Sequence, residues 1–183
     1  LRARGAAVGA DEIIVTSGAQ QALAIAAQLC FRRGDAVGVD AETYPAALDL
    51  FRTRGGLLRA GWDGVRCFYA MPAIGNPRSR PMADADRRAL LARDLEVVED
   101  DAYAELRFDG RIARPLVADD LTRVWQVGSF SKTLCPGLRV GWLVPPPAWH
   151  ERATELKHAS DLQASSLGQT VLELFLDKDD FDT

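Results

Sequence analysis

Short apolar runs alternate along this chain with longer segments that mix apolar and polar residues. The apolar runs are rich in β-branched residues, leucine or aromatic residues, and turn-forming or charged residues bound them, which is typical of buried strands. We expect strands at residues 12–16, 36–39, 65–71, 95–98, 121–127 and 140–144, and a further strand that starts at residue 57.

The segments between these runs have the composition of helices. Residues 22–31 are rich in good helix formers, and Gly34 follows two arginines where such a helix would end. We expect helices at residues 22–31, 46–54, 82–92 and 148–175, and a polar, frayed tail at 177–180. Because strands alternate with helices, the pattern predicts an α/β fold of three layers, α/β/α, with a mostly parallel sheet covered on both faces.

Polar residues gather in the loops that directly follow the predicted strands. Ligands of open α/β sheets bind at the edge that the carboxyl ends of the strands form. We therefore expect these loops to meet at one edge of the sheet; they contain Ser17 to Gln20, Tyr44, Asn76, Asp100 to Tyr103, and Ser129 to Lys132.

The segment at 127–141 places one lysine, Lys132, in a turn of small and hydroxyl residues. A lysine whose ammonium is partly desolvated becomes a nucleophilic amine, and the nearby Arg139 offers a fork geometry that suits phosphate. The pattern therefore favours a Schiff-base lysine under a phosphorylated aldehyde, pyridoxal phosphate. Two other interpretations stay open from these residues: the serine–lysine pair of a hydrolase, with Ser129 three residues earlier, and a surface lysine in a polar loop.

The loops after two other strands carry candidate ligand-binding residues. Small residues follow the first strand and precede a helix, so backbone N–H groups and the helix dipole would point at one anion; a plain strand-to-helix turn is the alternative. Tyr44 would lay its ring over a flat cofactor or pack in the core.

Three consecutive acids, Glu99, Asp100 and Asp101, end another predicted strand. Because like charges repel, we expect one of them to face a cation or a protonated ring nitrogen and the others to face solvent. Paired metal-binding carboxylates are a competing interpretation, which the absence of a histidine nearby in the sequence disfavours.

Composition narrows the function classes. The 183 residues suffice for one domain with a sizeable core, and 48% of them are hydrophobic. A net charge of −4 does not favour a nucleic-acid partner, and no apolar run approaches the roughly 20 residues that span a membrane. Three widely spaced cysteines, Cys30, Cys67 and Cys135, and the lack of an apolar signal segment at the N-terminus predict a reduced, cytoplasmic protein with no metal site.

Taken together, the motifs resemble the fold-type I pyridoxal-phosphate enzymes. The sequence is most similar to class I/II aminotransferases of the 2-aminoadipate (kynurenine) aminotransferase type and to the aminotransferase-like domain of MocR regulators. The matching segments, in the order of the family, are Thr16 to Ala22, Thr43 to Pro45, Asn76-Pro77, Glu99 to Tyr103, and Gly128 to Gly141.

The resemblance implies a role for each matching residue. Lys132 would form the Schiff base with pyridoxal 5'-phosphate and move a proton between substrate and cofactor. Asp100 would pair with the pyridine nitrogen, Tyr44 would stack on the ring, and Asn76 and Tyr103 would bind the ring hydroxyl. The implied phosphate-binding residues are Gly18, Ala19, Gln20, Ser129 and Arg139.

The sequence also departs from the family pattern. Arg78 and Ser79 stand where the family has Thr-Gly, and the segment at 59–68 is shorter than usual. The resemblance implies that residues 1–183 are the cofactor-binding large domain, without the N-terminal arm, the C-terminal small domain and the arginine that clamps the substrate carboxylate.

Three functions therefore stay open. The first is an aminotransferase, expected by resemblance to be a homodimer, which moves an amino group between an amino acid and a 2-oxo acid. The others are the effector domain of a MocR/GntR-type transcription regulator and a truncated, inactive remnant.

Overall fold

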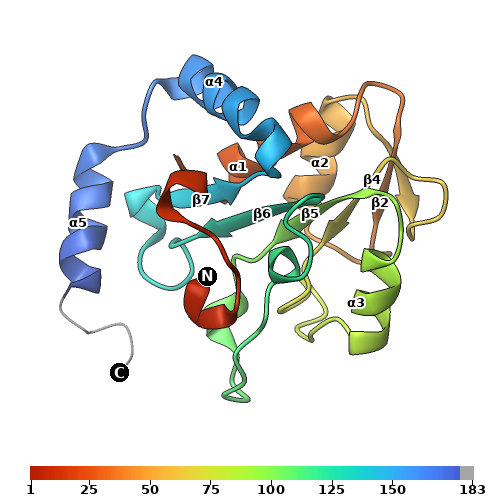
Figure 1. Cartoon of the computed structure of the whole chain (residues 1–183), viewed down its shortest axis with the longest axis horizontal. Coiled ribbons are helices and arrows are strands. Elements are labelled where there is room, and N and C mark those ends of the chain that lie inside the picture. Colours follow the sequence, from red (N-terminus) through yellow and green to blue (C-terminus); the bar gives the residue numbers. More distant parts are fainter. Residues whose placement is uncertain (178–183) are drawn as a thin grey trace.

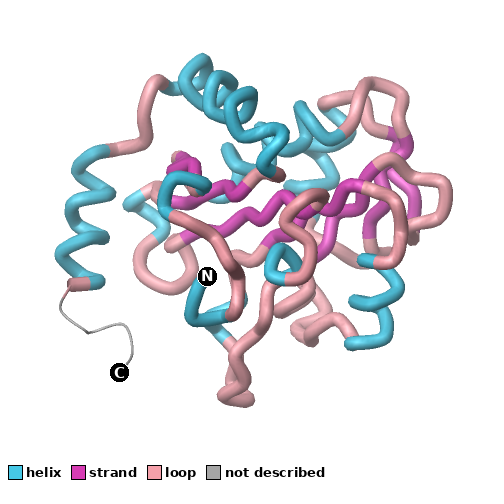
Figure 2. The backbone as a smooth tube through the Cα atoms, viewed as in Figure 1, coloured by secondary structure: helices cyan, strands magenta, loops and turns pink. Residues whose placement is uncertain are grey.

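The computed structural model describes residues 1–177 of the chain, and its centre is a single seven-stranded sheet (Figures 1 and 2). The strands are β1 (Ile14–Thr16), β2 (Ala36–Val39), β3 (Leu57–Ala60), β4 (Cys67–Ala70), β5 (Glu96–Asp100), β6 (Val124–Ser129) and β7 (Gly141–Val144).

The strand order across the sheet is β1-β7-β6-β5-β4-β2-β3. The pairs from β3 to β6 are parallel, whereas β7 runs antiparallel to both β6 and β1. The connection from β6 to β7 contains one short 3-10 segment and no crossover helix, so the chain returns antiparallel beside the strand that it has just left. The predicted mostly parallel α/β sheet is therefore confirmed, with β7 as the exception.

Helices lie on both faces of the sheet, as Figure 1 shows. On one face α1 packs against β5, β6 and β7 and also contacts α2 and α4, while α3 lies on the other face. The helices are α1 (Ala19–Cys30), α2 (Pro45–Thr53), α3 (Asp84–Leu91), α4 (His150–Asp161) and α5 (Ser166–Leu176). Short 3-10 segments span Arg2–Arg4, Ala10–Glu12, Ala104–Leu106, Leu116–Ala118, Pro136–Leu138 and Pro147–Trp149.

The predicted helix at 148–175 is interrupted and forms two helices. Leu162 ends α4 with a φ of 61°, a left-handed value that a helix cannot continue. Ser165 then caps α5, because its side chain accepts a hydrogen bond from the Gly168 N–H. The predicted frayed tail lies, beyond Asp177, outside the described residues. Within residues 1–177 no helix is long and apolar enough to cross a membrane.

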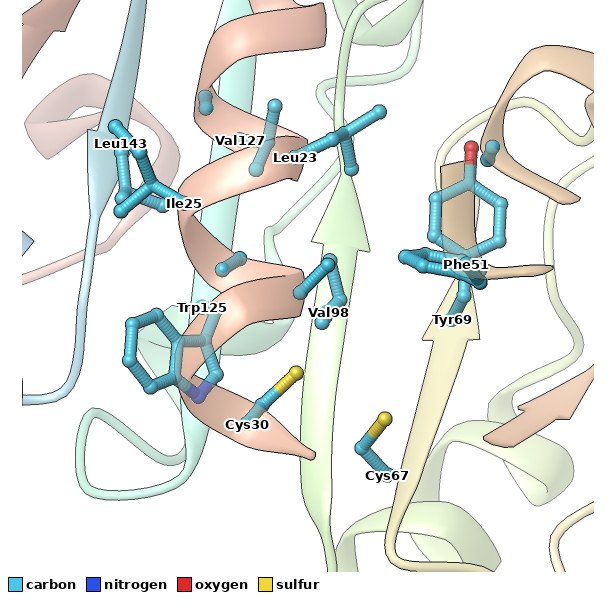
Figure 3. Close-up of a cluster of buried hydrophobic side chains, with 14 of the residues drawn as sticks. Leu23, Ile25, Cys30, Phe51, Cys67, Tyr69, Val98, Trp125, Val127 and Leu143 are labelled. Atoms are coloured by element: carbon cyan, nitrogen blue, oxygen red, sulfur yellow. The ribbon is translucent and has the colours of Figure 1, made fainter. Parts of the chain in front are cut away.

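The core on the α1 face is built around large side chains from the central strands (Figure 3). Trp125, Tyr69 and Leu143 are fully buried there against Leu23 of α1 and Phe51 of α2. A second core fills the opposite face, where Phe68 and Leu90 pack together. Burial on both sides explains why the strands read as nearly continuous apolar runs.

Strand alternation decides which layer each polar residue of the central strands enters. Successive side chains point to opposite faces, so Asp100 shares the α1 face with Val98, and Glu99 shares the other face with Val97. On β6 the same rule places Ser129 on the α1 face with Val127. The strand β5 extends through Asp100, beyond the predicted end at residue 98, so this alternation still governs the acids.

Candidate active site

A cavity of about 370 Å³ lies at the carboxyl ends of β5 and β6, next to the N-termini of α1 and α2. Backbone and side chains from six separate segments form its wall. They are Ala19, Gln20, Leu23, Tyr44, Ala46, Met71, Asp100, Ala102, Tyr103, Ser129, Ser131, Lys132 and Arg139.

Most residues expected from the sequence therefore meet in one place. The expected residues in the cavity wall are Ala19, Gln20, Tyr44, Asp100, Tyr103, Ser129, Lys132 and Arg139. Gly18, also expected, lies directly behind the wall, where its backbone touches Arg139: a Cβ added to Gly18 would lie 2.5 Å from Arg139 Nη2.

One side of the cavity is suited to an anion. Gly18 is the N-cap of α1, so the first-turn N–H groups of this helix point into the cavity wall formed by Ala19 and Gln20. Arg139 Nη2 donates to the Ser17 carbonyl over 2.9 Å, which fixes the guanidinium beside that turn. The positive helix end and the guanidinium thus face the same space.

The hydroxyl groups of the lysine turn complete this side. Ser129 Oγ donates to Ser131 Oγ over 2.9 Å and accepts the Ser131 N–H over 3.1 Å. In the hydrolase interpretation Ser129 would pair with Lys132, but its hydroxyl bonds Ser131 instead. Ser131, which the sequence offered only as one of several hydroxyl groups, lines the cavity.

Gly141 lies outside the cavity wall but shapes the site from behind, and sequence reasoning missed this role. A Cβ on Gly141 would lie 2.7 Å from the Gly128 carbonyl oxygen and 2.8 Å from Gly18 Cα. Glycine here lets β7 approach the turn before α1, which brings Arg139 to Ser17. A glycine at the start of a strand is a signal of close backbone approach, and it was available in the sequence.

Asp100 is the buried carboxylate of the cavity. Its Oδ2 accepts a hydrogen bond from Tyr69 Oη over 2.7 Å, and its Oδ1 accepts the Ala102 N–H over 3.3 Å. Burial raises the pKa of Asp100 above its ordinary value, and the bond from Tyr69 opposes this rise. Tyr69 was not predicted as a site residue, although a hydroxyl inside a buried strand signals that a partner is required.

The other two acids of the cluster correct a prediction. Glu99 and Asp101 were expected to face solvent, but both are buried on the opposite side of the sheet from Asp100. Glu99 accepts the N–H groups of Leu116 and Val117 over 2.7 and 3.1 Å, and Asp101 accepts from Arg4 Nη1 over 2.6 Å. Strand alternation turns the neighbours of Asp100 into the other layer, where backbone amides and an arginine bind them.

Lys132 faces the cavity together with two half-buried phenols. Its Nζ lies 5.7 Å from the ring centroid of Tyr103, and Tyr44 lines the same space. The side chain of Lys132 is exposed to solvent, so the partial burial that the sequence argument invoked for this amine is not found here. The turn that carries Lys132 lies beyond the end of β6, outside the packed layers.

Asn76 is the expected site residue that the structure does not bring into this cavity. It lines a neighbouring cavity of about 430 Å³ with Asp40 and Arg78, and Met71 borders both cavities. The loop that carries Asn76 closes on itself, because the Gly75 N–H donates to the Arg80 carbonyl over 2.9 Å. Its predicted role at the cofactor ring therefore stays a prediction.

A larger cavity of about 760 Å³ lies between α5 and the β1–β7 side of the sheet. Its wall is mainly apolar and includes Val15, Phe130 and Trp142. We place the candidate active site in the smaller cavity because a lysine, a carboxylate, two phenols and an arginine converge there. Among residues 1–177 no group of three or more histidine, cysteine, aspartate or glutamate side chains is arranged to hold a metal ion.

This chain is similar to a known protein family and to several relatives. The family description of aminotransferase class I and II matches residues 85–183. The uncharacterized HTH-type transcriptional regulator YdfD of Bacillus subtilis is 34% identical, over 93% of this chain and 40% of the regulator.

Two solved aminotransferases share the fold closely. Kynurenine aminotransferase of Pyrococcus horikoshii superposes with a TM-score of 0.85 at 31% identity, over 93% of this chain and 49% of that enzyme. LysN, the α-aminoadipate aminotransferase of Thermus thermophilus solved with N-(5'-phosphopyridoxyl)-L-leucine, gives a TM-score of 0.83 at 30% identity, over 92% and 50%.

The chain thus spans about half or less of the length of these relatives. Within that span its fold is that of the fold-type I aminotransferases, and its sequence matches the family description from α3 onward. The chain belongs to the aminotransferase class I and II family.

Proposed function

We propose that this chain binds pyridoxal 5'-phosphate in the 370 Å³ cavity and serves the transfer of an amino group between an amino acid and a 2-oxo acid. The observation that carries the proposal is the convergence of Lys132, Asp100 and the anion-binding turn on one cavity. Membership of the aminotransferase family and the phosphopyridoxyl group in the related LysN structure support the same cofactor.

The phosphate would lie on the side of the cavity formed by the start of α1. Ala19 and Gln20 at the start of α1, together with Ser129 and Arg139, line the cavity there. The residues fit a dianion because a helix N-terminus and a guanidinium both supply positive potential. Gly18 adds no side chain that would fill this space.

The ring would lie between the phosphate side and the end of β5. Tyr44 would cover one ring face, and the Asp100 carboxylate would hold a proton on the pyridine nitrogen through its negative charge. Tyr103, and Asn76 if its loop approaches, would donate hydrogen bonds to the ring hydroxyl. With its nitrogen protonated, the bound cofactor supplies an electron sink for the substrate α-carbon.

Lys132 would hold the cofactor covalently and later carry the proton. Lys132 lines the cavity and is exposed to solvent. As a free amine, Lys132 would take a proton from the substrate α-carbon and hold it for return.

We expect borohydride reduction of the protein mixed with pyridoxal phosphate to label the peptide that contains Lys132. The chain has two further lysines, Lys157 and Lys178, whose peptides serve as internal controls in the mass spectrum. Lys132→Arg is the matched control, since it retains the positive charge but lacks a primary amine, and it should abolish the label. Label that remains on another lysine in Lys132→Arg would contradict the proposal.

A second candidate function is the effector domain of a transcription regulator. The 34% identity with the regulator YdfD favours it, and such a domain would use the same cavity to sense rather than to turn over a ligand. Absorbance during addition of amino acids bears on this choice: rapid, complete conversion of the bound cofactor to its amine form would favour the aminotransferase over the effector domain.

We also propose that the chain corresponds to the cofactor-binding large domain of the family and acts as a cytoplasmic homodimer. The matched span of the relatives supports the domain assignment, and three free thiols agree with a reducing compartment. Sedimentation velocity measures the assembly, and a monomer at all concentrations would refute the dimer.

A further inference from the structure

Tyr69 lies beneath the candidate active site and contacts it through a single group. It stands on β4 opposite Val98 of β5, and its hydroxyl reaches forward to Asp100 Oδ2 over 2.7 Å. Figure 3 shows the ring beside Phe51, with the hydroxyl directed toward the carboxyl ends of the strands. The two rings meet edge to face, with centroids 5.4 Å apart at 66°.

The direction of this hydrogen bond is fixed by chemistry. Burial and the negative charge of Asp100 raise the pKa of Tyr69 well above its ordinary value, so the phenol keeps its proton. A protonated phenol has one O–H to donate, and the carboxylate accepts it. Tyr69 therefore binds Asp100 Oδ2 from the core, while Asp100 also lines the cavity.

We propose that Tyr69 is a positioning residue that orients the Asp100 carboxylate and keeps it ionised opposite the ring nitrogen of the cofactor. The proposal rests on the proposed function, because it assumes that Asp100 faces that nitrogen. Tyr69 itself, with no exposed surface, acts on the cofactor through Asp100 alone.

Several charged and titratable groups around Asp100 act on the pKa of its carboxyl group together with Tyr69. Burial and the neighbouring Asp101 raise the pKa of Asp100, whereas the bonds from Tyr69 and the Ala102 N–H lower it. The groups that share the cavity from other elements are Tyr44, Tyr103, Lys132 and Arg139. Since a protonated carboxyl cannot hold a proton on the pyridine nitrogen by charge, loss of the Tyr69 bond should weaken that pairing.

Tyr69→Phe removes the hydroxyl and leaves the ring in place against Phe51. In the protein without cofactor, carbon-13 NMR of the aspartate carboxyl groups, assigned with Asp100→Asn, should show the titration midpoint of Asp100 rise by about one pH unit or more. Absorbance titration should show pyridoxal phosphate binding weakened by about 10- to 100-fold at neutral pH.

Two further variants separate positioning from packing. Phe51→Leu disturbs the same ring contact but keeps the Tyr69 hydroxyl, so it should leave the Asp100 midpoint unchanged. In an Asp100→Asn background, Tyr69→Phe should cause no further loss of cofactor affinity, because the carboxylate that it assists is gone. An equal midpoint shift in Phe51→Leu, or an equal affinity loss in the Asp100→Asn background, overturns the proposal.

The NMR titration and the absorbance titration test different claims, so one claim can be refuted without the other. If the wild-type chain does not bind pyridoxal phosphate, the proposed function fails, and the carboxyl midpoint still reports whether Tyr69 controls Asp100. If the wild type binds the cofactor but Tyr69→Phe changes neither the midpoint nor the affinity, the role of Tyr69 is refuted while the proposed function stands.

Discussion

At the scale of single residues, glycine sets the shape of the anion-binding turn. Gly18 has a φ of +92°, a value that side chains rarely adopt, and Arg139 occupies the space where its Cβ would be. The same residue therefore allows the backbone turn and the approach of the guanidinium. In the sequence Gly18 is only a small residue in a loop. Its contact with Arg139, which is far away in the sequence, appears only in the folded chain.

We expect Gly18→Ala to weaken pyridoxal phosphate binding by roughly tenfold or more, since it displaces a charge-assisted phosphate ligand. Gly34→Ala is the matched control: Gly34 has the same φ of +92° but nothing within 4 Å of its added Cβ. The control should lower stability by the backbone cost of a positive φ, on the order of 1 kcal/mol, without a change in affinity. Equal affinity losses in both variants would argue against the contact with Arg139.

At the scale of elements, β5 delivers acids to two different layers. Asp100 enters the cavity, whereas Glu99 binds the start of the 3-10 segment at Leu116–Ala118 on the other face. Burial and the nearby Asp101 raise the pKa of Glu99 to about 8 although two backbone N–H groups and Arg87 oppose the rise. The strand therefore contains a carboxyl group whose ionisation opposes folding.

The sign of this effect follows from proton linkage. The folded chain holds the Glu99 proton more tightly than the unfolded chain, whose glutamate pKa is about 4.3, so stability falls as pH rises from roughly 4 to about 8. Glu99→Gln cannot ionise but offers one acceptor oxygen instead of two. We expect the variant to be less stable than the wild type near pH 5 and to approach or exceed it at about pH 8.5.

Urea denaturation at about pH 5, 7 and 8.5 measures this difference, which should change by on the order of a few kcal/mol across the range. Glu155→Gln is the control, because Glu155 pairs with Arg152 on the solvent-exposed side of α4. A pH-independent difference between wild type and Glu99→Gln would contradict the raised pKa.

At the scale of the whole molecule, the cavity joins segments that are remote in the sequence. Ser17, before α1, is bound by Arg139 and also donates to Asp161 Oδ2 of α4 over 2.7 Å. Lys157 Nζ holds the other oxygen of Asp161 at 2.8 Å. Tertiary contacts with α4 therefore hold the turn before α1, which forms one side of the cavity, in its place.

Pyridoxal phosphate should raise the midpoint of thermal unfolding. A ligand at about 100 times its Kd adds about 2.7 kcal/mol, which corresponds to a shift of roughly 5–10 °C for a chain of this size. Differential scanning fluorimetry measures it, and Lys132→Arg should show a smaller shift because the covalent link is lost. An unchanged midpoint at saturating cofactor would show that the cavity does not bind it.

The sequence by itself determined the class of fold and the chemistry at the strand ends. Alternation of apolar runs with helical segments predicted the mostly parallel α/β sheet, because strands that are buried on both faces are apolar at nearly every position. The same pattern placed Tyr44, Asp100 and Lys132 in loops that share one edge. It did so because parallel strands all end on the same side.

Only the tertiary structure decided which groups touch. Tyr69 and Asp100, or Arg139 and Ser17, become partners through strand order and close packing, which depend on contacts between residues far apart in the chain. The side of the sheet on which Glu99 and Asp101 lie depended on where β5 ends, and the position of Asn76 depended on how its loop folds on itself. These outcomes are set by pairing and packing energies that no local pattern records.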